Sequence, residues 1–159
     1  MKVCMFDSFS EQDRNLIIAA EKARENAYNP YSRFYVGAAL LAQNGEIITG
    51  ANVENASYGL TICAERSALV RANIQGIRQL EKIAISTRGE SFDVKEPTMP
   101  CGACRQWIYE FTQLSDTDIE IISVITKREK VLVASIFELL PRAFGPKDLG
   151  IDLSRFQKS

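Results

Sequence analysis

The chain of 159 residues contains no histidine. Imidazole is the base of serine triads and of cysteine–histidine pairs, and it is a common ligand of catalytic metals, so every mechanism that requires it is excluded. Any chemistry of this protein must therefore use cysteine, glutamate, aspartate, lysine, arginine or tyrosine side chains.

The chain also has no excess of positive or negative charge, and it has no long apolar run. Its 19 basic and 20 acidic residues give a formal net charge of −1, which creates no field that would attract a polyanion or an anionic membrane surface. No apolar run approaches the roughly 18 residues that a membrane span needs, and the N-terminal residues show no signal-cleavage pattern. We therefore expect a cytoplasmic protein that has neither nucleic acid nor membrane as a partner.

Cysteine is scarce as well, with four residues in the chain. Cytosolic redox buffers keep exposed thiols reduced, so free thiols or metal ligands are expected in place of a disulfide framework. The apolar content of 46% is enough to fill one hydrophobic core without such cross-links. By its length, the chain is predicted to form a single domain over residues 1–159.

Apolar residues recur with helical spacing in some segments and with strand-like spacing, or as short runs, in others. Asn44-Gly45 lies between two β-rich segments and is the pair preferred in a type I′ hairpin turn. Ser135 and Glu138 match the reciprocal capping pattern that begins a short helix. The predicted strands cover 35–42, 46–53, 80–86, 119–126 and 131–135, and the predicted helices cover 10–29, 63–73, 101–111 and 135–141.

The order of these elements predicts the architecture. Only residues 127–130 separate the last two strands, and because a parallel crossover needs about a dozen residues, these two strands must be antiparallel. Five strands and these helices in mixed order predict an α/β fold, a three-layer α/β/α sandwich around a five-stranded mixed sheet with the last two strands antiparallel.

Three of the cysteines lie where two of the predicted helices begin. Cys63 begins one helix, and Cys101 and Cys104 form a C-x-x-C motif at the start of another. A helix N-terminus carries a partial positive charge, which favours the thiolate form that binds metal. Three such ligands around zinc leave the fourth tetrahedral position open, as in catalytic sites. Glu65, two residues after Cys63, can then act as a general base toward zinc-bound water.

Each of these features also has a simpler interpretation. A C-x-x-C motif can be a redox pair, and cysteines are often small buried core residues. A glutamate in the first turn of a helix is favoured by the helix dipole without any catalytic role. The residues alone leave these alternatives open.

Several separated motifs together resemble one family. Zinc deaminases carry a ligand-x-Glu motif followed by Pro-Cys-x-x-Cys, with a variant in which all three ligands are cysteines. This chain has N-V-E-N-A-S-Y at 52–58, C-A-E-R-S-A at 63–68 and P-C-G-A-C-R-Q at 100–106. These motifs are similar to those of cytidine deaminase of the homotetrameric class. The similarity runs from N-P-Y-S-R-F at 29–34 to L-L-P-R-A-F at 139–144.

This resemblance implies a cytidine deaminase-like domain with an N-terminal extension at 1–9 and a C-terminal tail at 150–159. It implies one zinc per chain, bound by the three cysteines of the motifs, and a proton-transferring role for Glu65 on a zinc-bound hydroxide. Arg66 matches the arginine that donates hydrogen bonds to the cysteine sulfurs and withdraws charge from them. The loop before Pro100 is somewhat long for the family, and Cys4 has no counterpart in its motifs.

The resemblance also implies a nucleoside site that subunits share. The family packs an aromatic side chain on the nucleoside, binds ribose with an Asn-x-Glu pair, holds the base carbonyl with backbone N–H groups, and completes the site from a neighbouring subunit. A homotetramer with shared active sites is therefore expected. The corresponding substrate-binding residues here are Phe34, Asn52, Glu54, Asn55, Ala56, Tyr58, Ala64 and Phe144.

The implied activity is hydrolytic deamination of cytidine and deoxycytidine to uridine and deoxyuridine plus ammonia, by a hydrolase of cyclic amidines that serves pyrimidine salvage. The alternatives are a deaminase of a related cytosine nucleoside such as blasticidin S, an editor of bases in RNA or DNA, and a non-catalytic zinc-binding assembly module. The Asn52-x-Glu54 pair favours an unmodified ribose, and the short connection at 127–130 with the near-zero net charge disfavours an editor. Glu65 disfavours the assembly module, because structural zinc needs no general base.

Overall fold

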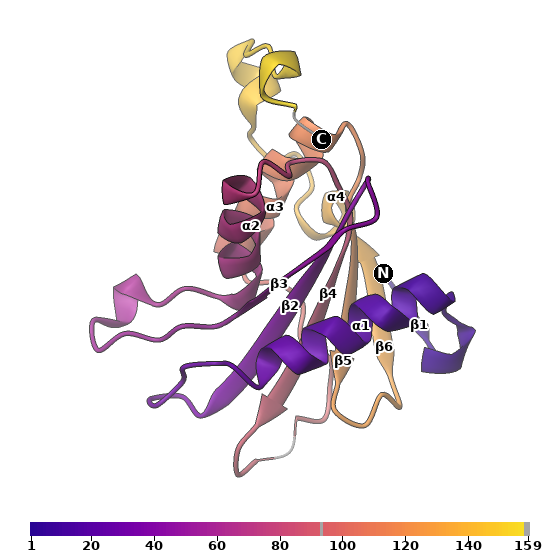
Figure 1. The fold of residues 1–159 in the computed structure, drawn as a ribbon, viewed down its shortest axis with the longest axis vertical. Coiled ribbons are helices and arrows are strands. Elements are labelled where there is room, and N and C mark those ends of the chain that lie inside the picture. The colour runs from indigo at the N-terminus through magenta and orange to yellow at the C-terminus, as the bar shows by residue number, and fades with distance from the viewer. Residues whose placement is uncertain (93, 158–159) are drawn as a thin grey trace.

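The computed structural model describes residues 1–92 and 94–157, and the strands within them form one mixed sheet with the order β1-β6-β5-β4-β2-β3 (Figure 1). The neighbours β4 and β5 are parallel, and all other neighbouring strands are antiparallel. The strands are β1 (Lys2–Cys4), β2 (Phe34–Ala42), β3 (Ile47–Ala51), β4 (Leu80–Gly89), β5 (Glu120–Ile125) and β6 (Val131–Ser135).

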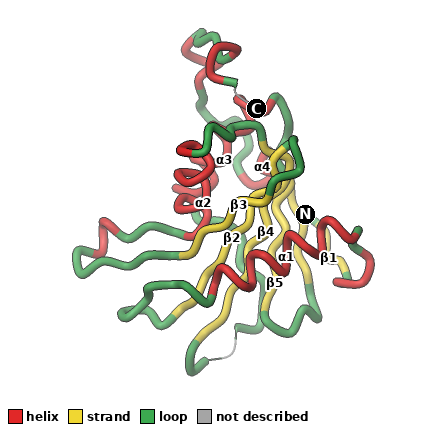
Figure 2. Tube along the Cα trace, in the orientation of Figure 1, coloured by secondary structure: helices red, strands yellow, loops and turns green. Residues whose placement is uncertain are grey.

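Helices cover both faces of this sheet, as predicted. One helix crosses one face, and two others lie side by side on the opposite face (Figures 1 and 2). The single helix is α1 (Glu11–Arg24), and the opposite face carries α2 (Ala64–Ile74), α3 (Gly102–Ser115) and the short α4 (Ile136–Leu139). Short 3₁₀ turns complete the described chain at Phe6–Ser8, Tyr58–Leu60, Pro146–Leu149 and Ser154–Phe156.

The core is divided between the two faces of the sheet, because side chains alternate along each strand. Successive side chains of a strand point to opposite faces of a sheet. Accordingly, Ala84 of β4 packs with Leu16 of α1, whereas Ile83 and Ile85 pack on the other face with Leu69 of α2. This alternation determines which residues of β4 can reach the space between the sheet, α2 and α3.

The prediction of five strands was wrong, because β1 adds a sixth. The N-terminal segment, expected to be an extension, pairs antiparallel with β6, with Lys2 opposite Val133. The Met1 ammonium group lies 2.6 Å from the Glu138 carboxylate, which fixes the start of the chain beside α4. A strand of three residues is too short to show an apolar period, and its pairing with a distant strand leaves no local sign in the sequence.

The hairpin predictions were confirmed, although one turn differs in type. β2 pairs antiparallel with β3, and β5 pairs antiparallel with β6 across 126–130. Of the two residues Asn44 and Gly45, only Gly45 has a positive φ, at 87°. A type I′ turn needs positive φ at both central residues, so the β2–β3 connection is a different, longer hairpin loop. Ser135 and Glu138 form the predicted capping box of α4.

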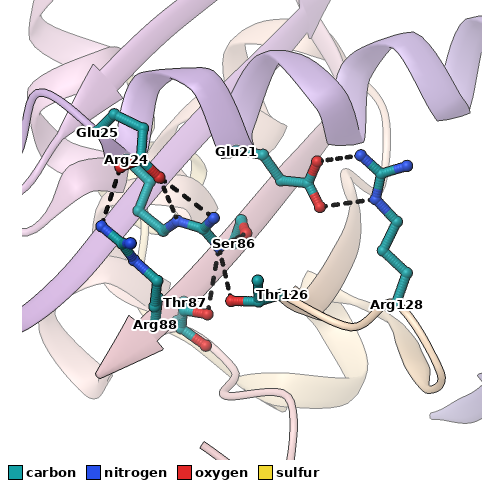
Figure 3. A network of polar contacts seen from close by, with 8 residues as sticks. All are labelled: Glu21, Arg24, Glu25, Ser86, Thr87, Arg88, Thr126 and Arg128. Carbon is teal, nitrogen blue, oxygen red and sulfur yellow. Dashed lines mark hydrogen bonds and ion pairs between the residues drawn. The ribbon is translucent and has the colours of Figure 1, made fainter. Parts of the chain in front are cut away.

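The end of α1 is attached to the sheet by a buried cation. Arg24 is 5% exposed, and its Nη1 atom donates to Ser86 Oγ at 2.8 Å, to Thr126 Oγ1 at 3.3 Å and to the Thr87 carbonyl at 3.4 Å (Figure 3). Glu25 accepts from Arg24 and from the neighbouring Arg88. These bonds hold α1 to the ends of β4 and β5. None of the described helices has the length and apolarity that a bilayer crossing requires.

Close contact between α1 and β2 depends on Gly37. A Cβ atom at this position would lie 2.0 Å from the Ala20 carbonyl oxygen and 2.4 Å from the Arg24 nitrogen. We predict that Gly37→Ala lowers the free energy of unfolding by about 1–3 kcal/mol, because backbone atoms would have to move apart. Chemical denaturation measures this change. Gly59→Ala, where nothing lies within 4 Å, is the control, and equal stability of both variants would contradict the prediction.

Candidate active site

Three cysteines meet between the starts of α2 and α3. Cys63 caps α2, Cys101 caps α3, and Cys104 lies in the first turn of α3. Their Sγ atoms all lie within 4.8 Å of one another, and those of Cys63 and Cys101 are 4.0 Å apart. Tetrahedral zinc with Zn–S bonds of about 2.3 Å requires sulfurs about 3.8 Å apart. The cluster therefore fits zinc after a small contraction.

The electrostatics of the cluster also suit a cation. The pKa of Cys63 is lowered to about 5, first by a hydrogen bond from the Cys104 thiol and then, against partial burial, by Arg66. The pKa of Cys104 is raised by its bond to Cys63 and by burial. Thiolates this close repel one another, so a bound divalent cation allows all three to ionise.

Two arginines support the cluster. Arg66 Nη2 lies 3.8 Å from Cys63 Sγ and donates to the Thr61 carbonyl at 3.0 Å, a position that suits its predicted effect on the sulfur. Arg105 was not predicted to have a role. Its Nε donates to the Pro100 carbonyl at 2.7 Å and its Nη1 to that of Leu139 at 3.0 Å. Arg105 thus fixes the backbone that precedes Cys101.

Glu65 lies beside the sulfurs as the second residue of α2. It is 5% exposed and lines the same cavity as Cys63 and Cys101. Burial raises the pKa of this carboxyl, and the nearby Cys63 charge raises it further. A raised pKa makes a carboxyl better suited to general acid–base catalysis than an ordinary exposed carboxyl. Its position and its pKa therefore both suit proton transfer.

The cavity at the cluster has a volume of about 310 Å³ and lies between β2, β4 and the starts of α2 and α3. It brings together the predicted residues Phe34, Asn52 and Glu54 with Glu65. Apart from these residues and from Cys63 and Cys101, the wall is made of residues that the sequence did not single out, from β2, β4 and the flanking loops: Ser32, Val36, Thr61, Ile85, Thr87, Thr98 and Met99. Some of these residues could have been found from the alternation of side chains along a strand. It places Val36 on the same face as Phe34, and Thr87 on the same face as Ile85.

The two residues of the predicted sugar-binding pair, Asn52 and Glu54, form different hydrogen bonds within the chain. The Asn52 side chain accepts from the Val36 N–H and donates to the Phe34 carbonyl, both at 2.9 Å, which leaves one N–H free for a ligand. Glu54 Oε2 accepts from the backbone N–H groups of Tyr31 at 2.9 Å and Ser32 at 3.1 Å. Although partial burial opposes it, bonding to Ser32 and Tyr31 lowers the pKa of Glu54, so the carboxylate stays ionised.

A second aromatic ring stacks on Phe34 from outside the lining of this cavity. Phe92, in the loop between β4 and α3, stacks on Phe34 with ring centroids 6.0 Å apart and an interplanar angle of 15°. Gly89 makes this possible, because a Cβ there would lie 2.7 Å from a carbon of the Phe92 ring. The loop that is long for the resembled family therefore supports Phe34 through Phe92, and its residues Thr98 and Met99 line the cavity.

The remaining predicted residues lie outside the lining of this cavity. Asn55, Ala56 and Tyr58 belong to the segment after Glu54, and Tyr58 is 73% exposed. Phe144 is 62% exposed, and its carbonyl accepts from Gln106 of α3 at 2.8 Å. Ala64 is buried as the first residue of α2. Their roles toward substrate stay predictions.

Comparison with known proteins places the chain among deaminases. A family model described as the cytidine and deoxycytidylate deaminase zinc-binding region matches residues 10–117. Cytidine deaminase of Halalkalibacterium halodurans is 47% identical over 138 residues, covering 86% of this chain and 98% of the relative. Cytidine deaminase of Sporosarcina psychrophila is 44% identical over 134 residues, covering 84% and 92%.

Solved structures agree with these relatives. The crystal structure of cytidine deaminase from Burkholderia pseudomallei superposes with a TM-score of 0.74 at 42% identity, covering 86% of this chain and 100% of the other. That of Mycobacterium tuberculosis gives a TM-score of 0.67 at 36% identity, covering 86% and 99%.

The sulfur cluster generates a prediction about metal content. We expect the purified protein to hold about one zinc per chain, and Cys101→Ala or Cys104→Ala to reduce this below about half, because tight binding needs the full set of thiolates. Metal analysis by mass spectrometry after gel filtration measures the content. Cys4→Ala, in β1, is the matched control and should keep its zinc. Full zinc in the Cys101 and Cys104 variants would show that these sulfurs are not the ligands.

Proposed function

The chain belongs to the cytidine and deoxycytidylate deaminase family, and from this premise we propose that it hydrolyses cytidine and deoxycytidine to uridine and deoxyuridine with release of ammonia. The observation that carries the proposal is the buried Glu65 on the wall of a cavity that also exposes Cys63 and Cys101. The cavity, of about 310 Å³, has the size typical of small-molecule sites. One domain over residues 1–159 and a cytoplasmic location stay predictions; residues 93, 158 and 159 lie outside the described part of the chain.

The reaction needs a nucleophilic water and a group that moves protons. Cys63, Cys101 and Cys104 would hold the zinc, which would supply the Lewis acidity that makes water nucleophilic near neutral pH. Glu65 then accepts the proton of the attacking water and delivers it to the ring nitrogen beside the carbon that bears the amino group. A second transfer through the same carboxylate protonates the amino nitrogen, which leaves as ammonia while the ring carbon gains a carbonyl.

Arg66 compensates for a weakness of the sulfur ligands. Three thiolates around a divalent metal give a net charge of −1, which reduces its Lewis acidity. The Arg66 guanidinium, 3.8 Å from Cys63 Sγ, withdraws part of that charge. The helix N-termini at Cys63 and Cys101 act in the same direction.

Substrate binding is proposed to use the opposite side of the cavity. Glu54 presents an ionised carboxylate whose Oε1 accepts from ribose hydroxyls while Oε2 is held by the backbone. Asn52 contributes its remaining N–H, and the Phe34 ring, supported by Phe92, packs against the nucleoside. Backbone N–H groups near Ala64 hold the base carbonyl.

We further propose a homotetramer in which a neighbouring chain completes each site. Support comes from large apolar side chains exposed in the segments that the family uses between subunits, namely Tyr58 at 73% and Phe144 at 62%. Leu60, next to Tyr58, is 66% exposed, and Ile74 at the end of α2 is 80% exposed. Association would bury these side chains and bring Ala56, Tyr58 and Phe144 to a partner's cavity.

The role of Glu65 is tested by Glu65→Gln, which keeps the size of the side chain but not its basicity. We predict that kcat for cytidine falls by about 100-fold or more, because proton transfer loses its carrier, while zinc content stays at the parent level. The conversion is followed by ultraviolet absorbance. Glu81→Gln, at an exposed position of β4, is the control. Parent-like turnover in Glu65→Gln would refute the mechanism.

The substrate class is tested with one preparation of the parent enzyme. We predict that cytidine and deoxycytidine are both deaminated with a much higher kcat/KM than blasticidin S, because Glu54 and Asn52 suit the hydroxyls of an unmodified sugar. Ammonia release, measured with a coupled assay, compares all three. Preference for blasticidin S would favour the alternative substrate, and zinc-loaded protein without any turnover would favour the assembly module.

A further inference from the structure

Thr87, near the end of β4, has a buried hydroxyl without a partner. The residue is 1% exposed, and its Oγ1 atom has no hydrogen bond to any residue within 1–92 and 94–157. Buried polar atoms are nearly always paired, because an unpaired one has lost its hydration without compensation. Such an atom needs an explanation, and a ligand is one.

The side chain of Thr87 lies on the cavity side of the sheet. Ser86 points toward α1, where its hydroxyl accepts from Arg24 at 2.8 Å, so strand alternation places Thr87 on the opposite face with Ile85. Thr87 lines the same cavity as Cys63 and Glu65. The unpaired hydroxyl therefore belongs to the wall of the proposed active site.

The backbone of Thr87 is held from the other face, so the residue cannot turn away. Its carbonyl accepts from Arg24, which also donates to the neighbouring Ser86 and to Thr126, the residue after β5 (Figure 3). Thr87 lies between Val36 of β2 and Ile125 of β5 in the sheet. With the backbone fixed and a β-branched side chain restricted at χ1, the hydroxyl keeps its place beside the cavity.

Three other polar side chains of the cavity wall, those of Ser32, Thr61 and Asn52, differ from Thr87 because they are hydrogen-bonded within the chain. Ser32 Oγ accepts from the Phe34 N–H at 3.1 Å, Thr61 Oγ1 accepts from the Asn55 N–H at 3.3 Å, and Asn52 bonds β2. The nearest parts of the wall around Thr87, Val36 and Ile85, are apolar. A partner for this hydroxyl has to come from what enters the cavity.

We propose that the Thr87 hydroxyl forms a hydrogen bond with the polar edge of the pyrimidine nucleoside in this cavity and so contributes to its recognition. The inference rests on the proposed function, since it takes the ligand from there. A pyrimidine offers carbonyl, ring-nitrogen and amino groups, and a hydroxyl can donate to or accept from each of them. Thr87 is thus a substrate-contacting residue in addition to Asn52 and Glu54.

The test is Thr87→Val, which keeps the shape of the side chain and removes the hydroxyl. We expect kcat/KM for cytidine to fall about 5- to 10-fold, mainly through a higher KM, as for the loss of one neutral hydrogen bond made in both the bound and transition states. We expect Tm to stay unchanged or rise, because a buried unpaired polar group is removed. Thr87→Ser, which retains the hydroxyl, should stay within about 2- to 3-fold of the parent kcat/KM.

Thr112→Val is the matched control. Thr112 is 2% exposed in α3, and its hydroxyl donates to the Tyr109 carbonyl at 2.6 Å, outside the cavity lining. This variant leaves the Tyr109 carbonyl without that donor, so Tm should fall while kcat/KM stays at the parent value. The opposite pattern in Thr87→Val separates a contact with substrate from a contribution to folding.

The outcomes are distinct. Unchanged kcat/KM in Thr87→Val, with the parent active on cytidine, overturns the inference and leaves the proposed function intact. The inference is also overturned if Thr87→Val lowers both kcat/KM and Tm and Thr87→Ser does the same. The residue would then act through the fold and not through a contact with substrate. A parent that deaminates neither cytidine nor deoxycytidine overturns the proposed function and removes the ligand on which the inference depends.

Discussion

The site depends on one constraint: the N-termini of α2 and α3 must bring three cysteine sulfurs together. Cys63 and Cys101 can approach to 4.0 Å only if both helix N-termini point to the same place. This arrangement puts Glu65 beside the sulfurs and Arg66 within 3.8 Å of Cys63. Because the dipoles of both helices also favour thiolates there, the fold and the chemistry of the cluster require the same geometry.

The sheet supplies the opposite wall of the site. β4 has Ile85 and Thr87 on the cavity face, and Ser86 between them is bound to Arg24 of α1 on the other face. α1, which contributes no residue to the cavity lining, therefore holds the backbone from which that wall is built. The close approach of α1 to β2 at Gly37 serves the same arrangement, because it brings Arg24 to the strand ends.

Features that depend on neighbouring residues could be predicted from the sequence, and features that depend on distant pairing could not. The cysteines at helix starts, the capping box at Ser135 and the antiparallel final hairpin follow from local patterns, and the structure confirmed them. The strand β1 left no local signal, because three residues cannot show a period and its partner β6 is far along the chain. Likewise, the stacking of Phe92 on Phe34 arises from a loop folding back across Gly89.

The central claim is that Cys63, Cys101 and Cys104 form an open zinc centre, with three sulfur ligands and one position for water. Zinc X-ray absorption spectroscopy of the purified protein observes these neighbours directly. We expect three sulfur atoms at about 2.3 Å and one oxygen at about 2.0 Å, as in a catalytic zinc site. Four sulfur neighbours would instead indicate a closed structural site, and a first shell without sulfur would show that the cluster does not bind the metal.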